Sequence, residues 1–324
     1  MAAERSERAK SQEPRLSASL IVVNQRNEIL LVQRNPKSSA FAGVHVFPGG
    51  NYDFSQDAGS LEMTAIRESF EETGILLASS SSTGRFPGDA ELDEARERIH
   101  SQKELFGEFL GRWGLKAEAA RLERFTMWTT PANQPRRFKT QFYITFLSNP
   151  SASSNAGSTK FTSGDKLDRL PTPDGGQEVV AARFVHISDI LREVANRQIM
   201  LMPPQYYIVK TLLPLLEGRS TTEEQKAKVE RMARGSFGGL DINPMPMKVE
   251  AVEEAQKAQQ RKGWSCLVYE GDEARGGVKG RRHRSLIKFE KPGVVQEIEL
   301  QRNFDVYDED VVKGLIQENE KSKL

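Results

Sequence analysis

The chain of 324 residues contains a single cysteine, Cys266. One thiol excludes an intrachain disulfide, and it excludes a zinc ribbon built from paired CxxC motifs. No apolar run approaches the roughly 20 residues that a helix needs to cross a bilayer, so we expect no membrane span. The net charge is only +1, which gives no general reason to expect nucleic acid as a partner. Composition and charge therefore do not indicate a function, and the function has to be inferred from local motifs.

The most informative motif is the stretch AIRESFEETGILL, at residues 65–77. Because a helix turns about 100° per residue, Glu68, Glu71 and Glu72 would share one open face. Gly74 is typical of a helix C-terminus, so two of these carboxylates would lie in the last turn. The helix dipole is negative there, and each carboxylate should cost about 0.3–1 kcal/mol. A solvated acidic face is the general alternative, but this unfavourable placement indicates a cation.

With the preceding Gly49 and Gly50, this motif resembles the signature GG…REXXEEXG of the Nudix hydrolases. The resemblance implies an α/β fold, an α/β/α sandwich with a mixed sheet. It also implies that the glutamates hold Mg²⁺ or Mn²⁺ for the hydrolysis of a diphosphate linked to another group. Hard cations of this kind take oxygen ligands from carboxylates and leave positions to water and phosphate.

Two details depart from the family pattern. The spacing from Gly50 to Arg67 is three residues longer than usual, and Gly59 stands where a glutamate normally precedes the arginine. That glutamate is a structural partner of the arginine in the family. Asp57 and Glu62 are both candidates to replace it, and the sequence does not distinguish between them.

The resemblance also implies roles for individual residues. Glu71 and Glu72 are the expected metal ligands, and Glu68 is either a third ligand or the general base. In the family a further acidic ligand or base often comes from a distant loop. Glu178 is the candidate, and an exposed glutamate at the start of a strand is the equal alternative. The expected metal ligands are Gly50 (through its carbonyl), Glu68, Glu71 and Glu72. The expected catalytic residues are Glu68, Glu71, Arg67 and Glu178.

Two further stretches, LLVQRNPKSSAFAGVHVFPGG and WTTPANQPRRFKTQFYITF, resemble the peroxisomal Nudix-type coenzyme A diphosphatases. This resemblance implies cleavage of CoA or acyl-CoA into 3′,5′-ADP and a 4′-phosphopantetheine product. Arg34, Arg136 and Arg137 could bind the phosphates, because arginine forks suit that geometry, although each is more often an ordinary surface residue. The basic cluster GRRHR at residues 280–284 favours a solvated loop, with a phosphate contact as the alternative.

Other substrates fit the same metal site. NADH, ADP-ribose and dinucleoside polyphosphates are the alternatives, although the peroxisomal NADH diphosphatases typically carry a cysteine zinc ribbon that this chain lacks. A protein that binds a nucleotide without cleaving it is a further alternative. Such proteins tend to lose glutamates of the motif, and all three are present here.

The chain ends in Ser322, Lys323 and Leu324, the C-terminal tripeptide that the peroxisomal import receptor binds. We therefore expect the protein to reach the peroxisome. A fluorescent protein fused to the N-terminus should collect in peroxisomes, and deletion of Leu324 should leave the fusion in the cytosol. A fusion that stays cytosolic with the tripeptide free would refute this address.

The order of apolar runs and polar breaks predicts the organisation of the chain. We expect a mixed sheet between helices, followed by an extension of small α+β character. The expected segments are a flexible N-terminus at 1–14, a Nudix domain at 15–217 with a mobile insertion at 148–176, a C-terminal extension at 218–321 and the targeting tripeptide at 322–324.

Overall fold

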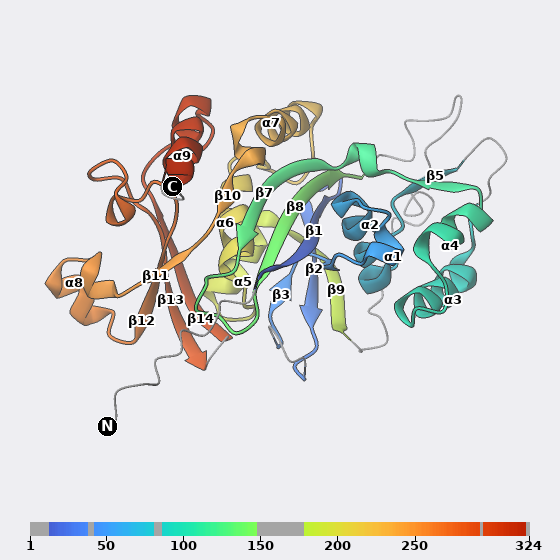
Figure 1. Cartoon of the computed structure of the whole chain (residues 1–324), viewed down its shortest axis with the longest axis horizontal. Helices are drawn as coiled ribbons and strands as arrows, with labels where there is room; N and C mark the ends of the chain where they lie inside the picture. The colour runs from blue at the N-terminus through green and yellow to red at the C-terminus, as the bar shows by residue number, and fades with distance from the viewer. Residues whose placement is uncertain (1–12, 38–41, 81–85, 148–177, 292–293, 322–324) are drawn as a thin grey trace, which may run out of the picture.

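The computed structural model describes residues 13–37, 42–80, 86–147, 178–291 and 294–321. A central mixed sheet carries helices on both faces, and a second sheet lies beside it toward the C-terminus (Figure 1). The α/β class and the mixed sheet between helices that were predicted from the sequence are confirmed. The expected insertion at 148–176 and the tripeptide at 322–324 lie outside the described residues.

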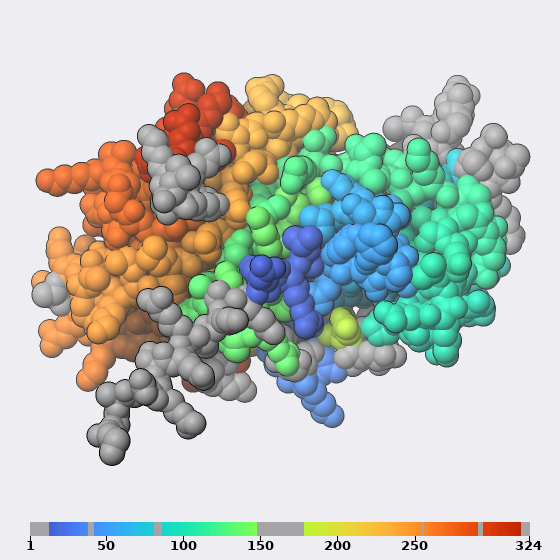
Figure 2. Space-filling view, viewed as in Figure 1, coloured from blue at the N-terminus to red at the C-terminus, as the bar shows by residue number. Residues whose placement is uncertain are grey.

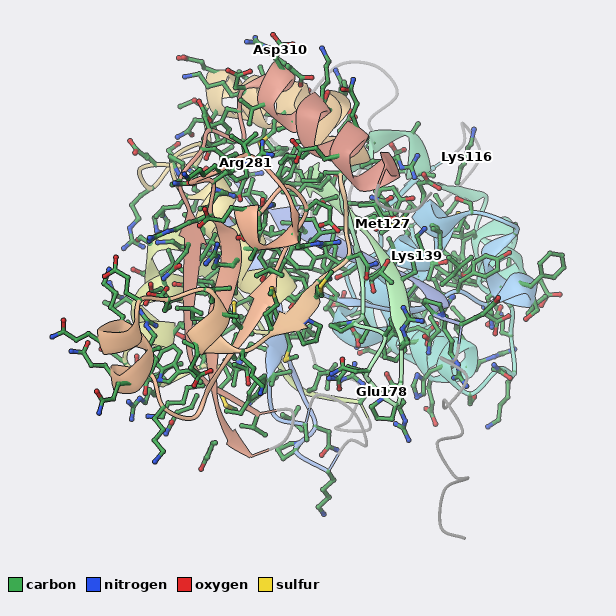
Figure 3. All side chains as sticks on the ribbon, turned by 60° about the vertical axis from the view of Figure 1, so that its left-hand side comes forward. Lys116, Met127, Lys139, Glu178, Arg281 and Asp310 are labelled. Carbon is green, nitrogen blue, oxygen red and sulfur yellow. The ribbon has the colours of Figure 1, made fainter. Side chains whose placement is uncertain are left out.

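The central sheet is mixed because β1 pairs with β8, and β7 with β10, in parallel, whereas its other pairs are antiparallel. Within the described residues its order is β10-β7-β8-β1-β2-β3, with β4 paired to β1 and β9 paired to β2. Figure 3 labels Met127 on β7 and Lys139 on β8, which lie side by side in the sheet. The strands are β1 (Arg15–Val23), β2 (Glu28–Arg34), β3 (His45–Val46), β4 (Gly49–Asn51), β7 (Glu123–Thr129), β8 (Phe138–Phe146), β9 (Val179–His186) and β10 (Asp241–Ile242).

Both faces of this sheet are buried, which explains why β1 has a continuous apolar run. Alternate residues of a strand point to opposite faces. Leu20 and Val22 pack with helices α2 to α4, and Ile21 and Val23 pack with helices α5 to α7. The helices of the first face are α2 (Leu61–Thr73), α3 (Asp89–His100) and α4 (Phe106–Arg112). Those of the second face are α5 (Ile187–Ala195), α6 (Pro203–Leu212) and α7 (Glu223–Arg234). No helix in the described ranges is both long and apolar enough to cross a membrane.

The C-terminal extension forms an antiparallel sheet of its own, in the order β11-β12-β13-β14. Figure 2 shows the extension, coloured orange to red, meeting the rest of the molecule along a continuous boundary on this face. Its elements are β11 (Met245–Met247), α8 (Ala255–Gln260), β12 (Trp264–Val268), β13 (His283–Lys291), β14 (Val294–Arg302) and α9 (Glu309–Lys321). The remaining elements are α1 (Phe54–Asp57) and the strand pair β5 (Ala78–Ser80) and β6 (Leu115–Ala117).

The extension shares one core with the central sheet. Its short strand β10 continues that sheet through Asp241, which pairs with Met127. The Trp128 ring packs edge-to-face on Tyr269, with 5.3 Å between centroids. The Tyr207 hydroxyl lies 2.9 Å from Nε2 of His283. Residues on both sides of position 217 therefore form a single packed unit.

The basic cluster at 280–284 is partly buried, so the expected solvated loop is wrong for Arg284. The Arg284 side chain is only 1% exposed, and its guanidinium donates to both carboxylate oxygens of Asp272, at 2.7 and 2.8 Å. Arg281 pairs with Glu318 of α9 at 2.5 Å and lies beside that helix, far from Glu178 in the view of Figure 3. These arginines hold the extension together.

Candidate active site

Helix α2 carries the three glutamates, and side chains and backbone fix its two ends. The Ser60 hydroxyl accepts from the Met63 amide at the N-terminus, which satisfies one of the free amides there. Gly74 closes the helix with φ +74° and donates to the Phe70 carbonyl. The predicted helix end at Gly74 is confirmed, and Glu71 and Glu72 lie in the last turn.

A cavity of about 1370 Å³ brings most of the expected residues together. The carboxylate face of α2 opens into this cavity and not onto the free surface. Glu71 is 8% exposed and Glu72 only 2%. The expected site residues that line the cavity are Arg34, Gly50, Arg67, Glu68, Glu71, Glu72, Arg136 and Glu178. Arg137 is not among the described lining residues, and its Nε donates to the Thr130 carbonyl at 3.1 Å.

The structure identifies the partner of Arg67 that the sequence left open. Asp57, at the end of the short helix α1, accepts from Arg67 Nε at 2.7 Å and from Nη2 at 3.0 Å. Its carboxylate also accepts from the Thr64 hydroxyl, at 2.8 Å, and is fully buried. The longer segment between Gly50 and Arg67 thus contains α1, and α1 places the Asp57 carboxylate beside Arg67. Glu62 instead accepts from Ser60 at the N-terminus of α2.

Arg67 in turn holds two of the glutamates. Its Nη1 donates to Glu68 Oε1 at 2.9 Å and to Glu71 Oε1 at 2.8 Å. Burial alone would lower the pKa of Arg67, but its hydrogen bond to Asp57 and the charges of both glutamates raise that pKa above its ordinary value. Arg67 therefore acts on the site by positioning carboxylates.

We expect Asp57→Asn to destabilise the fold strongly, because it removes one partner of a buried ion pair. Breaking such a pair typically costs about 3–5 kcal/mol. Urea unfolding followed by circular dichroism measures the loss. The matched control is Glu62→Gln, the other candidate from the sequence, which should cost no more than about 1 kcal/mol. Equal losses in the two variants would contradict the assignment of Asp57.

The three carboxylates fit a divalent cation by their burial and charge. Glu72 Oε2 accepts from the Gly49 amide at 2.9 Å, whereas its buried Oε1 has no hydrogen-bond partner among the described residues. Burial raises the pKa of Glu72 well above its usual range, and the Glu68 charge raises it further. The pKa of Glu68 is raised to about 7, first by burial and then by neighbouring carboxylates, against the lowering effect of Arg67. A bound cation would relieve this repulsion.

Gly50 lies directly against one of these carboxylates. A Cβ at position 50 would stand 2.4 Å from Cδ of Glu68, so a larger residue there would push the Glu68 carboxylate out of its present position. Among the described residues, no three Asp, Glu, His or Cys side chains already converge as a metal site. Arg67 holds Glu68 and Glu71 in the arrangement that the structure shows.

Two residues from other strands complete the charged end of the cavity. Nη1 of Arg34, at the end of β2, lies 4.0 Å from Glu72 Oε1. In the part of the chain that the structure describes, the buried Nε of Arg34 has no hydrogen-bond partner. Glu178 stands just before β9, and its charge contributes to the raised pKa of Glu68 and Glu72. Because β9 pairs with β2, Glu178 comes to the site although it lies 106 residues after Glu72 in the sequence.

Sequence reasoning missed His100, at the end of α3. Its Nδ1 lies 3.2 Å from Glu71 Oε2, and the side chain lines the cavity. Arg96, one turn earlier, donates from Nη2 to the Glu71 carbonyl at 2.9 Å. No spacing signal connects these residues to the motif, since α3 reaches α2 only through tertiary packing.

Comparisons with known proteins identify the fold. Residues 57–212 match the family model described as the NUDT19 Nudix domain. The crystal structure of a NUDIX hydrolase from Alicyclobacillus acidocaldarius superposes with a TM-score of 0.50 at 21% identity, covering 63% of this chain and 92% of that one. The fold is therefore the Nudix fold.

The chain is also similar to curated proteins over part of their length. The chain is 25% identical over 243 residues to acyl-coenzyme A diphosphatase NUDT19 of Gallus gallus, covering 56% of this chain and 59% of that protein. It is 24% identical over 243 residues to the Homo sapiens protein of the same name, covering 57% and 60%. The chain thus spans about 60% of the length of these relatives.

Proposed function

This chain belongs to the Nudix hydrolases through its domain at residues 57–212, and from that premise we propose that it hydrolyses the diphosphate bond of coenzyme A or an acyl-coenzyme A. The products would be 3′,5′-ADP and 4′-phosphopantetheine or its acylated form. The relatives named as acyl-coenzyme A diphosphatases support this choice of substrate.

One observation carries the proposal: Glu68, Glu71 and Glu72 line a cavity large enough for a nucleotide-like substrate, and burial raises the pKa of Glu68 and Glu72. We propose that Glu71, Glu72, Glu68 and the Gly50 carbonyl would hold Mg²⁺ or Mn²⁺. Such a cation, when bound, neutralises the diphosphate charge and lowers the pKa of water. Arg67 would keep Glu68 and Glu71 aligned, since it donates to both.

The remaining charged residues would act on the substrate and the attacking water. Hydrolysis needs a group that accepts a proton from water, and Glu68 and Glu178 are the two candidates in the cavity. Arg34 and Arg136 line the same cavity and would bind phosphate oxygens. Hydrolysis breaks one P–O bond of the P–O–P bridge. The water oxygen bonds to the attacked phosphorus, and the bridging oxygen leaves with the other phosphate.

The test is to incubate the purified protein with Mg²⁺ and a panel of substrates, and to identify the products by mass spectrometry. The panel is CoA, acetyl-CoA, octanoyl-CoA, NADH, ADP-ribose and diadenosine polyphosphate. We expect 3′,5′-ADP from the CoA compounds as the fastest product. Faster cleavage of NADH or ADP-ribose would overturn the substrate, and binding without any turnover would favour a nucleotide-binding role.

We also propose that the reaction takes place in the peroxisome, where the predicted address would deliver the protein. The residues of that address, Ser322 to Leu324, lie outside the described part of the structure. The fluorescent fusion with and without Leu324 is the experiment that tests this proposal.

A further inference from the structure

The cavity that holds the glutamates continues onto the C-terminal extension. Its volume of about 1370 Å³ exceeds the ~300–1,000 Å³ of a typical site for a drug-sized molecule. Residues of α2 line it in one region, and residues of β11, β12 and β13 line it in another. These elements lie on opposite sides of β7 and β8 in Figure 1. A long substrate bound by its diphosphate at α2 would extend onto the C-terminal sheet.

The wall that the extension contributes is largely apolar. Of its ten described lining residues, Lys248 and Glu290 are the charged ones. Met247 and Leu267 are half-buried, and Phe289 keeps 37% of its surface exposed. When an apolar ligand covers apolar side chains that water contacts in a cavity, the burial of this surface favours binding. This region therefore favours a ligand group of low polarity, unlike the charged region at α2.

The wall is fixed relative to the metal-binding helix. Leu267 packs against the core that the extension shares with the central sheet. Trp128, which lines the cavity, packs edge-to-face on both Tyr207 and Tyr269 at 5.3 Å between ring centroids. The Tyr207 hydroxyl hydrogen-bonds with buried His283 at the start of β13. The sheet can therefore contact a substrate arm without first having to become ordered, which favours affinity.

We propose that β11, β12 and β13 form the binding surface for the apolar acyl-thioester arm of the substrate, and that this surface makes the enzyme prefer acylated over free coenzyme A. The inference rests on the function proposed above. A second nucleotide would fit this wall less well, because the polar side chains there are Lys248, Ser265 and Glu290, and most of its ribose hydroxyls and base amides would lie against methionine, leucine and proline side chains. A linear acyl arm has no such polar groups.

The test compares free CoA, butanoyl-CoA and octanoyl-CoA as substrates of the full-length protein. Each methylene that is fully buried tightens binding by about fourfold. We expect the wild-type KM to fall at least tenfold from CoA to octanoyl-CoA. Phe289→Ser and Met247→Ser should each reduce that KM ratio at least fivefold, with a smaller effect on the ratio of kcat values. The matched control is Phe54→Ser on α1, which is 82% exposed, does not line the cavity and should keep the ratio.

Three outcomes would count against the proposal. A wild-type KM that is equal for CoA and octanoyl-CoA would overturn it, and so would variants that keep the wild-type KM ratio. Cleavage of NADH or ADP-ribose without cleavage of any CoA compound would overturn the proposed function as well, so the two failures are distinguishable. Because Phe289 is exposed, its variant should fold normally, and thermal melts of each variant check this directly.

Discussion

Glu72→Gln should lower turnover at least a hundredfold while the protein stays folded. The substitution removes the charge of the most deeply buried carboxylate in the cavity. Removing a single group that stabilises transition-state charge commonly costs about 10²–10³ in kcat. The glutamine oxygen can still accept from the Gly49 amide, as Oε2 of Glu72 does at 2.9 Å. The loss would therefore be one of chemistry and cation binding.

Stability measurements separate this explanation from a simple folding defect. A buried neutral amide costs less to desolvate than a buried carboxylate, so the melting temperature of Glu72→Gln without metal should equal or exceed that of the wild type. Added Mn²⁺ should raise the wild-type melting temperature, because a ligand at 100 times its Kd stabilises by about 2.7 kcal/mol. The variant should show a much smaller rise.

The control on the same helix is Glu62→Gln, which does not line the cavity and should keep both turnover and the response to Mn²⁺. Near-normal turnover by purified Glu72→Gln would contradict the proposed metal site. An equal rise in melting temperature with Mn²⁺ in wild type and variant would place the cation elsewhere.

The sequence predicted those parts of the molecule that depend on local pattern. The strands β1 and β2 have buried apolar residues on both faces, so their apolar runs are visible in the sequence, and the two strands pair antiparallel. The end of α2 follows from one glycine, because Gly74 adopts the left-handed conformation with φ +74°. Such features need no knowledge of distant residues.

Features that depend on tertiary packing escaped prediction. Asp57 was one of two candidates for the partner of Arg67, and the sequence did not decide between them because the four-residue helix that carries Asp57 is too short to show a periodic pattern. Strand β10 has two residues, Asp241 and Ile242, yet it continues the central sheet. Arg284 was expected in a solvated loop because an arginine side chain does not reveal its partner, and Asp272 is 12 residues away. In each case the deciding contact is between residues whose spacing carries no signal.

A fragment of residues 1–217 should fail to fold, although it contains the whole predicted Nudix segment. The extension covers aromatic side chains of the central sheet. Phe125 packs on Phe237 with 4.9 Å between ring centroids, and Trp128 packs on Tyr269 at 5.3 Å. Truncating one such aromatic typically costs about 3–5 kcal/mol. The loss of packing around several aromatic side chains together would approach the free energy of unfolding of a whole domain, which is roughly 5–15 kcal/mol.

Loss of β10 would also leave the backbone of β7 unpaired at the edge of the sheet, which invites aggregation. We therefore expect the fragment to be insoluble, or to lack a cooperative thermal transition in circular dichroism. A protein that lacks only residues 322–324 is the control and should melt like the full chain. Tyr269→Ala, which removes one ring of the shared core, should give an intermediate loss of stability. A soluble, monomeric fragment that melts cooperatively near the full-length temperature would show that the extension is an independent domain, and the shared core would then contribute little to folding.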